Sequence, residues 1–121
     1  MDKTLAGRHI LVVEDEMMNL MMIEDMLANL ERASVSAAAT VDQALALIER
    51  QPFDAAMLDV NLNGTKSYSV ADALAARGVP FVFATGYSDH GLREDYRDRP
   101  MLKKPFKHEQ LVDSLTRLLS G

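Results

Sequence analysis

The sequence predicts an α/β domain in which a single parallel β-sheet carries helices on both faces. Strand-like and helix-like segments alternate five times along the chain, with no internal repeat and no linker-like stretch. The strand-like segments are short apolar runs, as is typical of parallel strands covered on both sides. Such alternation favours right-handed crossovers within one open sheet. A chain of 121 residues is long enough for one domain of this kind.

In the first half of the chain, after a short polar lead over residues 1–8, the pattern predicts two strands and two helices. The strands are residues 9–13, an apolar β-branched run, and residues 33–39, a weaker one. Leucine and isoleucine recur every three or four residues over 17–30, which predicts a helix. Most of its five methionines are interpreted as core-filling side chains, with an adaptable methionine-lined binding surface as the alternative. Thr40 and Gln43 form a capping-box pattern for a second helix that ends near residue 51.

The second half repeats this alternation. The remaining strands are expected at residues 53–58, 79–84 and 101–103. Asn63-Gly64 is a turn signal, and a third helix over 67–77 has Gly78 as its cap. The charged residues 89–96 support at most a short helix. A final helix carries five apolar residues on one face: Leu111, Val112, Leu115, Leu118 and Leu119.

Composition limits the possible functions. Hydrophobic residues make up 48% of the chain and charged residues 26%, as in ordinary globular proteins. The absence of cysteine excludes disulfides and thiolate chemistry. A net charge of −5 argues against direct nucleic-acid binding. No apolar stretch approaches the ~20 residues that span a bilayer, and no signal peptide opens the chain. We therefore expect a cytoplasmic protein that binds no membrane.

Asp59 ends the third strand, at the edge of the sheet where open α/β folds bind ligands. A lone aspartate there would more simply be a polar residue that closes a strand. However, Glu14 and Asp15 follow the first strand, Thr85 follows the fourth, and Lys104 follows the fifth. Because parallel strands end at one edge, these residues are expected to converge there.

Such a cluster suits phosphoryl transfer. The carboxylates of Glu14, Asp15 and Asp59 would repel one another, and a hard divalent cation such as Mg²⁺ would relieve the repulsion. A solvated acidic loop is the simpler alternative. Lys104 suits a phosphoryl or carboxylate oxygen, and Thr85 adds a hydroxyl. An aspartate nucleophile beside such groups would accept a phosphoryl group.

The sequence strongly resembles the receiver domain of two-component response regulators. The matching motifs are LVVEDE at residues 11–16, MLD at 57–59, FATG at 83–86 and KPF at 104–106. The resemblance implies one receiver domain over residues 1–121, with a flavodoxin-like (βα)5 fold and strand order 2-1-3-4-5. The interval between Thr85 and Lys104 is shorter than usual, which implies a shortened fourth helix.

The resemblance also implies the roles of the site residues. Asp59 corresponds to the phosphoacceptor. Glu14 and Asp15 correspond to the acidic pair that binds Mg²⁺, with Asp15 as the more direct ligand, and the backbone carbonyl of Asn61 completes the coordination. Lys104 matches the phosphate-binding lysine, whose bond to the following proline is cis in the family.

Four residues are implied in switching: Thr85 with its hydroxyl, Gly86, Tyr87 and Met101. Receivers usually carry an aromatic residue three positions before the lysine, and it moves inward with the threonine on phosphorylation. Met101 occupies that position here, so the usual aromatic toggle is absent. Tyr87 and the side chain of Asn61 match positions that tune dephosphorylation.

Residues 80–87, PFVFATGY, look like the PFxFATG[G/Y] motif of the "FAT GUY" receivers. Those are mostly stand-alone receivers of alphaproteobacteria, linked to the general stress response and to kinases of the HWE and HisKA2 types. The resemblance thus implies a phosphohistidine donor, either a histidine kinase of such a type or a histidine phosphotransfer protein. A downstream protein is expected on the face from the fourth helix to the fifth.

Other functions fit the sequence less well. A haloacid-dehalogenase-like phosphatase would need a second aspartate where Asn61 stands, and the acidic residues 14–16 would repel the phosphate of a flavin carrier. The chain is therefore expected to catalyse only its own phosphorylation and dephosphorylation. A receiver excised from a hybrid histidine kinase and a phosphate sink both stay open as alternatives to a stand-alone regulator.

Overall fold

The computed structural model describes residues 5–62, 65–85, 101–104 and 106–120. Within these ranges, five parallel strands form one sheet in the order β2-β1-β3-β6-β7. The strands are β1 (His9–Val13), β2 (Ser34–Ala38), β3 (Ala55–Asp59), β6 (Phe81–Thr85) and β7 (Met101–Lys103). This confirms the predicted parallel α/β fold, because β6 and β7 are the fourth and fifth strands of the expected 2-1-3-4-5 order.

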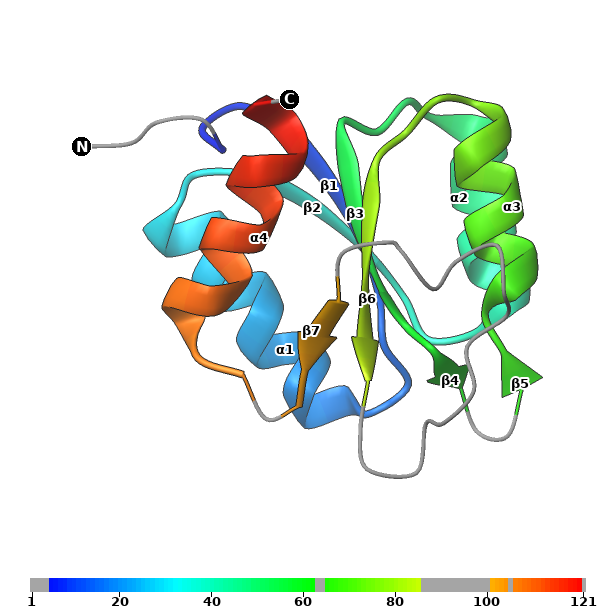
Figure 1. Cartoon of the computed structure of the whole chain (residues 1–121), viewed down its shortest axis with the longest axis horizontal. Coiled ribbons are helices and arrows are strands. Elements are labelled where there is room, and N and C mark those ends of the chain that lie inside the picture. Colours follow the sequence, from blue (N-terminus) through cyan, green and yellow to red (C-terminus); the bar gives the residue numbers. More distant parts are fainter. Residues whose placement is uncertain (1–4, 63–64, 86–100, 105, 121) are drawn as a thin grey trace.

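Helices cover both faces of the sheet (Figure 1). The α-helices in the described residues are α1 (Met17–Asp25), α2 (Val41–Arg50), α3 (Tyr68–Ala76) and α4 (His108–Ser120). Helices α1 and α4 lie on one face, and α2 and α3 lie on the other. The shortened fourth helix expected before the fifth strand falls on residues 86–100, outside the described residues.

Alternate residues of each central strand enter different cores. In β1, Leu11 and Val13 pack with α2 and α3, whereas Ile10 and Val12 pack with α1 and α4. The same alternation holds in β3 and β6, and the core residues of these two strands and of β1 are fully buried. Because both faces of the sheet are buried, the strands read as continuous apolar runs in the sequence.

The first helix has the predicted extent but not the predicted burial. Helix α1 continues without a break into a π-helical turn, η1 (Met26–Leu30). Leucine and isoleucine of the predicted stripe are buried, among them Leu20 and Ile23. The interpretation of the methionines as core-filling is wrong for four of the five, since Met17, Met18, Met21 and Met22 are exposed.

The ends of α2 and α3 agree with their sequence signals. The Thr40 hydroxyl accepts a hydrogen bond of 3.1 Å from the Gln43 backbone N–H, and the Gln43 side chain accepts one of 2.8 Å from Ala39 N–H. These reciprocal bonds satisfy donors at the start of α2. Gly78, just after α3, has φ of +72°, a conformation that glycine adopts without strain.

Two local features differ from the sequence prediction. Leu5 is buried against the α1–α4 core, so the lead before β1 is not simply polar. After β3 the chain forms a small antiparallel hairpin from β4 (Asn61–Leu62) and β5 (Thr65–Lys66). Residues 63–64, where the turn was predicted, lie outside the described residues. The hairpin leads into α3 through a hydrogen bond of 2.9 Å from Ser67 N–H to Val60 O.

Candidate functional site

The fold brings the ends of four strands to one edge of the sheet. Glu14 follows β1, Asp59 is the last residue of β3, Thr85 is the last residue of β6, and Lys104 follows β7. The strand register aligns Val13 with Leu58, so the residues that follow them lie side by side. The edge predicted from the sequence therefore exists, and Glu14, Asp59, Thr85 and Lys104 stand at it.

Three carboxylates gather at this edge. One oxygen from each of Glu14, Asp15 and Asp59 lies within 4.8 Å of the other two. Glu14 and Asp59 are almost fully buried, with 1% and 4% exposure, and Asp15 is half-buried. Acids this close and this buried need a compensating positive charge.

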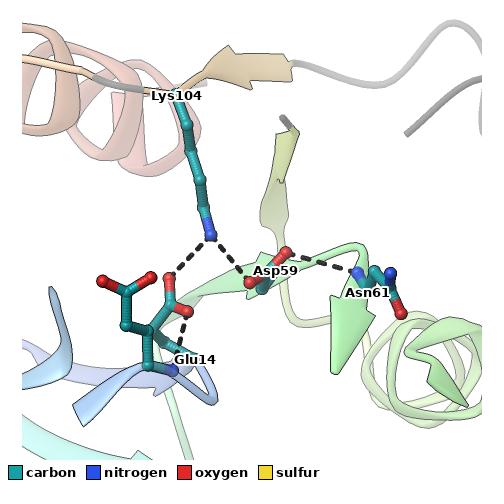
Figure 2. A network of polar contacts seen from close by, with 5 residues as sticks. Glu14, Asp59, Asn61 and Lys104 are labelled. Carbon is teal, nitrogen blue, oxygen red and sulfur yellow. Dashed lines mark hydrogen bonds and ion pairs between the residues drawn. The ribbon is translucent and has the colours of Figure 1, made fainter. Parts of the chain in front are cut away.

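Lys104 supplies part of that charge (Figure 2). Its Nζ atom lies 2.7 Å from Asp59 Oδ2 and 2.9 Å from Glu14 Oε2, so one ammonium group bridges two carboxylates. Burial acts to lower the pKa of Lys104, but the contacts with Asp59 and Glu14 outweigh it and raise that pKa. The lysine is therefore charged at neutral pH.

Backbone N–H groups hold the acids in place. Asn61 N–H donates to Asp59 Oδ1 at 3.2 Å, and Glu16 N–H donates to Glu14 Oε1 at 3.1 Å. Each bond spans two residues, the local pattern by which Asx-type turns fix an acidic side chain against the chain that follows it. Sequence reasoning missed these two backbone donors. Each donor lies two residues after its acid in the sequence, and this spacing was the available signal.

Glu14 is the electrostatically strained member of the cluster. Burial, and then repulsion from Asp59, raise its pKa from the ordinary 4.5 to about 7, against the opposing effects of Lys104 and the Glu16 N–H group. One lysine thus does not balance three acids. The negative charge of the cluster would therefore favour the binding of a further cation at neutral pH.

The acidic cluster fits Mg²⁺ by its chemistry. Glu14, Asp15 and Asp59 offer only oxygen donors, which Mg²⁺ prefers, and a few carboxylates suffice because this ion keeps several of its waters. The raised pKa of Glu14 points the same way, since a bound divalent cation favours the ionised carboxylate. The residues present therefore match the ion expected from the sequence.

Thr85 lies beside the cluster at the end of β6. It is buried, and its carbonyl oxygen accepts a hydrogen bond of 2.8 Å from Lys104 N–H. This bond ties the end of β6 to the residue that carries the bridging ammonium group. A shift of the chain at Thr85 would therefore reach Lys104 directly.

The remaining residues expected in switching are only partly described. Met101 begins the edge strand β7 with its side chain 38% exposed. Gly86 and Tyr87 lie outside the described residues, as does Pro105, which follows the lysine. Asn61 stands directly after the cluster in β4, where its N–H group contacts Asp59. In the described part of the chain, no helix is long and apolar enough to cross a membrane.

Comparisons with known proteins agree with this fold. A family model described as the response regulator receiver domain matches residues 10–116. The chain is 49% identical to SdrG from Sphingomonas melonis Fr1, whose solution structure aligns with a TM-score of 0.81 over 98% of this chain and 99% of that one. No match was found among curated proteins.

Two further solved structures are similar. The BeF3-activated conformation of SdrG, from Pseudomonas melonis Fr1, is 47% identical, covers 94% of this chain and 98% of that one, and has a TM-score of 0.77. The receiver domain of the sensor histidine kinase PA1611 from Pseudomonas aeruginosa PAO1 is 32% identical, with a TM-score of 0.80 over 96% and 100% of the two chains. That structure has a magnesium ion in its active site cleft.

The family match covers most of the chain and agrees with the sheet order and with the acids at its edge. This chain therefore belongs to the response regulator receiver domain family, the phosphoryl-accepting signalling domains of two-component systems.

Proposed function

We propose that Asp59 accepts a phosphoryl group from a phosphohistidine with the help of Mg²⁺, and that its phosphorylation changes a partner-binding face. The observation that carries this proposal is the buried cluster at the end of β3. There, Asp59 lies within 4.8 Å of two other carboxylate oxygens and within 2.7 Å of a lysine ammonium group. An aspartate that only closes a strand would need neither the two carboxylates nor the lysine beside it.

Transfer requires one displacement at phosphorus. A carboxylate oxygen of Asp59 forms the new O–P bond while the N–P bond of the phosphohistidine breaks. The leaving imidazole nitrogen keeps the bonding electrons and takes up a proton. The product is an acyl phosphate on Asp59 and a neutral histidine on the donor. The chain acts here on itself and turns over no external substrate.

Neighbouring groups stabilise charge on the transferred phosphoryl group. Lys104 exchanges its carboxylate contact for a phosphoryl oxygen, which its compact ammonium group also suits. Thr85 offers its hydroxyl from the end of β6. Glu14, Asp15, Asp59 and the carbonyl of Asn61 would hold Mg²⁺, which would neutralise charge on the phosphoryl group.

The switch follows from competition for Lys104. In the unphosphorylated site this lysine is shared by Asp59 and Glu14, and its backbone N–H bonds to Thr85 O. A phosphoryl group on Asp59 redirects the ammonium group and the threonine hydroxyl together. The change then passes to Gly86 and Tyr87, and to Met101 on β7, which pairs with β6. With Met101 in place of an aromatic toggle, Tyr87 carries the signal.

The phosphoryl donor is a histidine kinase, with the HWE and HisKA2 types as candidates, or a histidine phosphotransfer protein. The PFVFATGY segment supports placement among the FAT GUY receivers and hence a role in the general stress response. Similarity to SdrG at 49% identity over nearly the whole chain supports the receiver function itself. The form that we propose for it is a stand-alone cytoplasmic regulator. The output partner binds the face that extends from the short fourth helix expected from the sequence to the fifth helix, which is α4 of the structure.

A receiver from a hybrid kinase is the second candidate. The 32% identity to the receiver of a sensor histidine kinase favours it. Such a receiver passes its phosphoryl group on to a histidine phosphotransfer protein. A phosphate sink would receive it and lose it to water.

Phosphotransfer profiling tests the function. Purified kinases of the host are autophosphorylated with labelled ATP and mixed with the chain, with and without Mg²⁺. We expect one kinase to transfer label within the shortest times and only with Mg²⁺. An Asp59→Asn variant must stay unlabelled. No transfer from any kinase or phosphotransfer protein, together with no labelling by acetyl phosphate, would overturn the proposal.

Heteronuclear NMR tests the switch. Beryllium fluoride, which mimics a phosphoryl group on aspartate, is added with Mg²⁺ to the labelled chain. Amide shifts are expected around Thr85, Gly86 and Tyr87 and at Met101. An unchanged spectrum at these residues in a protein that binds the mimic would show that phosphorylation is not relayed through β6.

A further inference from the structure

The first helix carries an exposed apolar surface that the proposed chemistry does not use. Met17, Met18, Met21 and Met22, hereafter the methionine patch, are 62%, 80%, 61% and 50% exposed. They account for four of the five large hydrophobic side chains that are exposed in the described residues, and the fifth is Met101. Soluble proteins rarely leave such a contiguous apolar surface uncovered without a use for it.

The four methionines share one side of α1. Met17 and Met21 are four residues apart, as are Met18 and Met22, so the four side chains form two adjacent rows along the helix. Leu20, Ile23 and Leu27 occupy the opposite, buried side. One turn further along the exposed side, the surface becomes polar, with Asp25 hydrogen-bonded to Asn29. The apolar surface is therefore confined to the first two turns of the helix.

Those two turns are the ones next to the acidic cluster. Met17 comes two residues after Asp15, and α1 starts at the edge of the sheet toward which β6 and β7 run (Figure 1). Asp59 is only 4% exposed at that edge. A protein donor must bring phosphorus to bonding distance of Asp59, so it must cover the surface that surrounds this residue.

Charge favours an apolar contact for this donor. Its phosphoryl group is anionic, while Glu16 is exposed beside the patch and Asp15 is half-buried at its start. These acids do not attract the phosphoryl group, so we expect the surface beside them to contribute apolar contact, to which flexible methionine side chains are suited. The occupant consistent with these features is the phosphohistidine-bearing protein itself, through an apolar surface next to its histidine.

We propose that the methionine patch is an oxidation-sensitive contact surface, through which hydroperoxides control phosphoryl transfer from protein donors to Asp59. This inference rests on the proposed function of Asp59. Each thioether sulfur attacks the outer oxygen of hydrogen peroxide, an S–O bond forms and the O–O bond breaks. Sulfur loses two electrons, the peroxide is reduced, and proton transfer releases water and a methionine sulfoxide.

The sulfoxide changes the contact without touching the chemistry at Asp59. It turns a flexible apolar side chain into a polar one, which disfavours burial against an apolar partner. Among the described residues, the hydrogen bonds and ion pairs of Asp59 and Lys104 involve none of the patch side chains. Small phosphodonors need no such contact, so their reaction with Asp59 is expected to persist. Methionine sulfoxide reductases reverse the change.

The protein contains its own comparison residue for this reaction. Met57, two residues before Asp59, is fully buried in β3. It is expected to oxidise after the patch, because peroxide reaches exposed thioethers first. Peptide mass spectrometry of the full chain after brief treatment with hydrogen peroxide measures this order. Oxidation of Met57 as fast as that of Met18 would show that the patch is not selectively oxidised.

The functional test compares two donors before and after peroxide, which catalase then removes. Acetyl phosphate is the small donor, and the protein donor is an autophosphorylated host kinase that transfers to the untreated chain. We expect transfer from the kinase to slow by about tenfold or more, as for the loss of central contacts in an interface. Labelling by acetyl phosphate is expected to stay within about twofold of its initial rate. Treatment with both reductases, MsrA and MsrB, is expected to restore the kinase reaction.

Two variants separate the patch from other oxidisable residues. The first replaces all four patch methionines by leucine, which is apolar and cannot form a sulfoxide, and its kinase reaction is expected to resist peroxide. The second replaces them by glutamine, a polar mimic of the sulfoxide, and it is expected to accept from acetyl phosphate but poorly from the kinase. Circular dichroism checks that both keep the helix content of the wild-type protein.

Several results would overturn the inference. One is a kinase reaction that peroxide leaves unchanged, and another is equal loss in the wild type and the leucine variant, which would place the sensitive residue elsewhere. Normal transfer from the kinase to the glutamine variant would count against it equally. If the untreated chain accepts from neither donor, the proposed function itself fails and the inference falls with it.

Discussion

Glu14 and Asp59 end neighbouring strands and share one lysine, yet their roles differ. Asp59 receives a hydrogen bond from Asn61 N–H and an ion pair from Lys104, which orient both of its oxygens. Glu14 is even more buried, and its raised pKa reflects the energetic cost of ionising a third acid there. We infer that Asp59 accepts the phosphoryl group, whereas the buried carboxyl of Glu14 makes the site favour a bound cation.

Mg²⁺ binding is therefore expected to depend on pH through Glu14. Its pKa is raised from 4.5 to about 7 in the fold. Folding therefore favours the protonated form of Glu14. The stability that this preference contributes is fully present below pH 4.5 and is lost as the pH rises through about 7. Mg²⁺ requires the ionised form of Glu14. As the pH rises toward 7, the affinity for Mg²⁺ is therefore expected to increase by up to about tenfold per pH unit, and binding is expected to release a proton.

Calorimetry in two buffers with different ionisation enthalpies counts this proton. In the Glu14→Gln variant, proton release is expected to disappear and the affinity to become nearly independent of pH between about 6 and 8, one pH unit to either side of the wild-type pKa of about 7. A wild-type affinity that does not vary over this interval would contradict the role of Glu14.

Lys104 is expected to stabilise the protein when the metal is absent. The variant Lys104→Met keeps the apolar stem but leaves two buried carboxylates without their ammonium partner. We expect the free energy of unfolding to fall by about 1–3 kcal/mol, since a charged hydrogen bond to Asp59 and an ion pair with Glu14 are both lost. Mg²⁺ is expected to recover more stability in this variant than in the wild type.

Urea denaturation with and without Mg²⁺ measures both effects. Lys103→Met is the matched control, because Lys103 is the adjacent lysine and is exposed on β7. Equal loss of stability in the two variants would mean that the bridge to Glu14 and Asp59 contributes little.

At this scale, sequence reasoning could place the site but not its internal contacts. The positions of Glu14, Asp59, Thr85 and Lys104 follow from the ends of parallel strands, which meet at one edge whatever the details. Which acid is most buried, and which acids the lysine bridges, depend on side-chain packing around the edge. The sequence pattern carries no such information.

At the scale of elements, α1 contains both the best and the poorest sequence prediction. The stripe of Leu20, Ile23 and Leu27 located the helix and its buried side. The same phase places Met18 and Met22 on the opposite side, so their exposure could have been predicted. It was missed because apolar residues are usually assigned to the core whatever their phase. The β4–β5 hairpin was missed because strands of two residues have no periodicity to detect.

The start of α2 allows a quantitative test at this scale. Replacing Thr40 by alanine removes the hydroxyl that accepts from Gln43 N–H. We expect the protein to lose about 0.5–2 kcal/mol of unfolding free energy, as is usual for an N-cap. Thr40→Ser keeps the hydroxyl and is expected to retain most of the stability. Thermal denaturation of the three proteins measures the difference, and equal melting of the alanine and serine variants would show that the cap contributes nothing.

At the scale of the molecule, two apolar cores are joined by one sheet. Leu74 of α3 belongs to the core on one face and Leu111 of α4 to the core on the other, and both are fully buried. Because each central strand contributes alternate side chains to both cores, we expect the domain to unfold as one cooperative unit. The continuous apolar runs of the strands indicated that both faces of the sheet are buried, which is why the fold class could be predicted from the sequence.

Truncation on either face tests this cooperativity. Leu74→Ala and Leu111→Ala are each expected to lower the free energy of unfolding by about 2–5 kcal/mol. In each variant, far-ultraviolet circular dichroism and amide NMR signals from both faces are expected to report one shared transition. Loss of α4 signals before those of α3 in the Leu111→Ala variant would mean that the two faces are separate units.

Asp59 is expected to be the residue that accepts the phosphoryl group. The direct measurement is to phosphorylate the chain with acetyl phosphate and Mg²⁺, reduce the acyl phosphate with borohydride, and locate the reduced residue by peptide mass spectrometry. We predict reduction at position 59 and at neither Glu14 nor Asp15. Reduction at another carboxylate, or undiminished labelling of Asp59→Asn, would contradict the central claim.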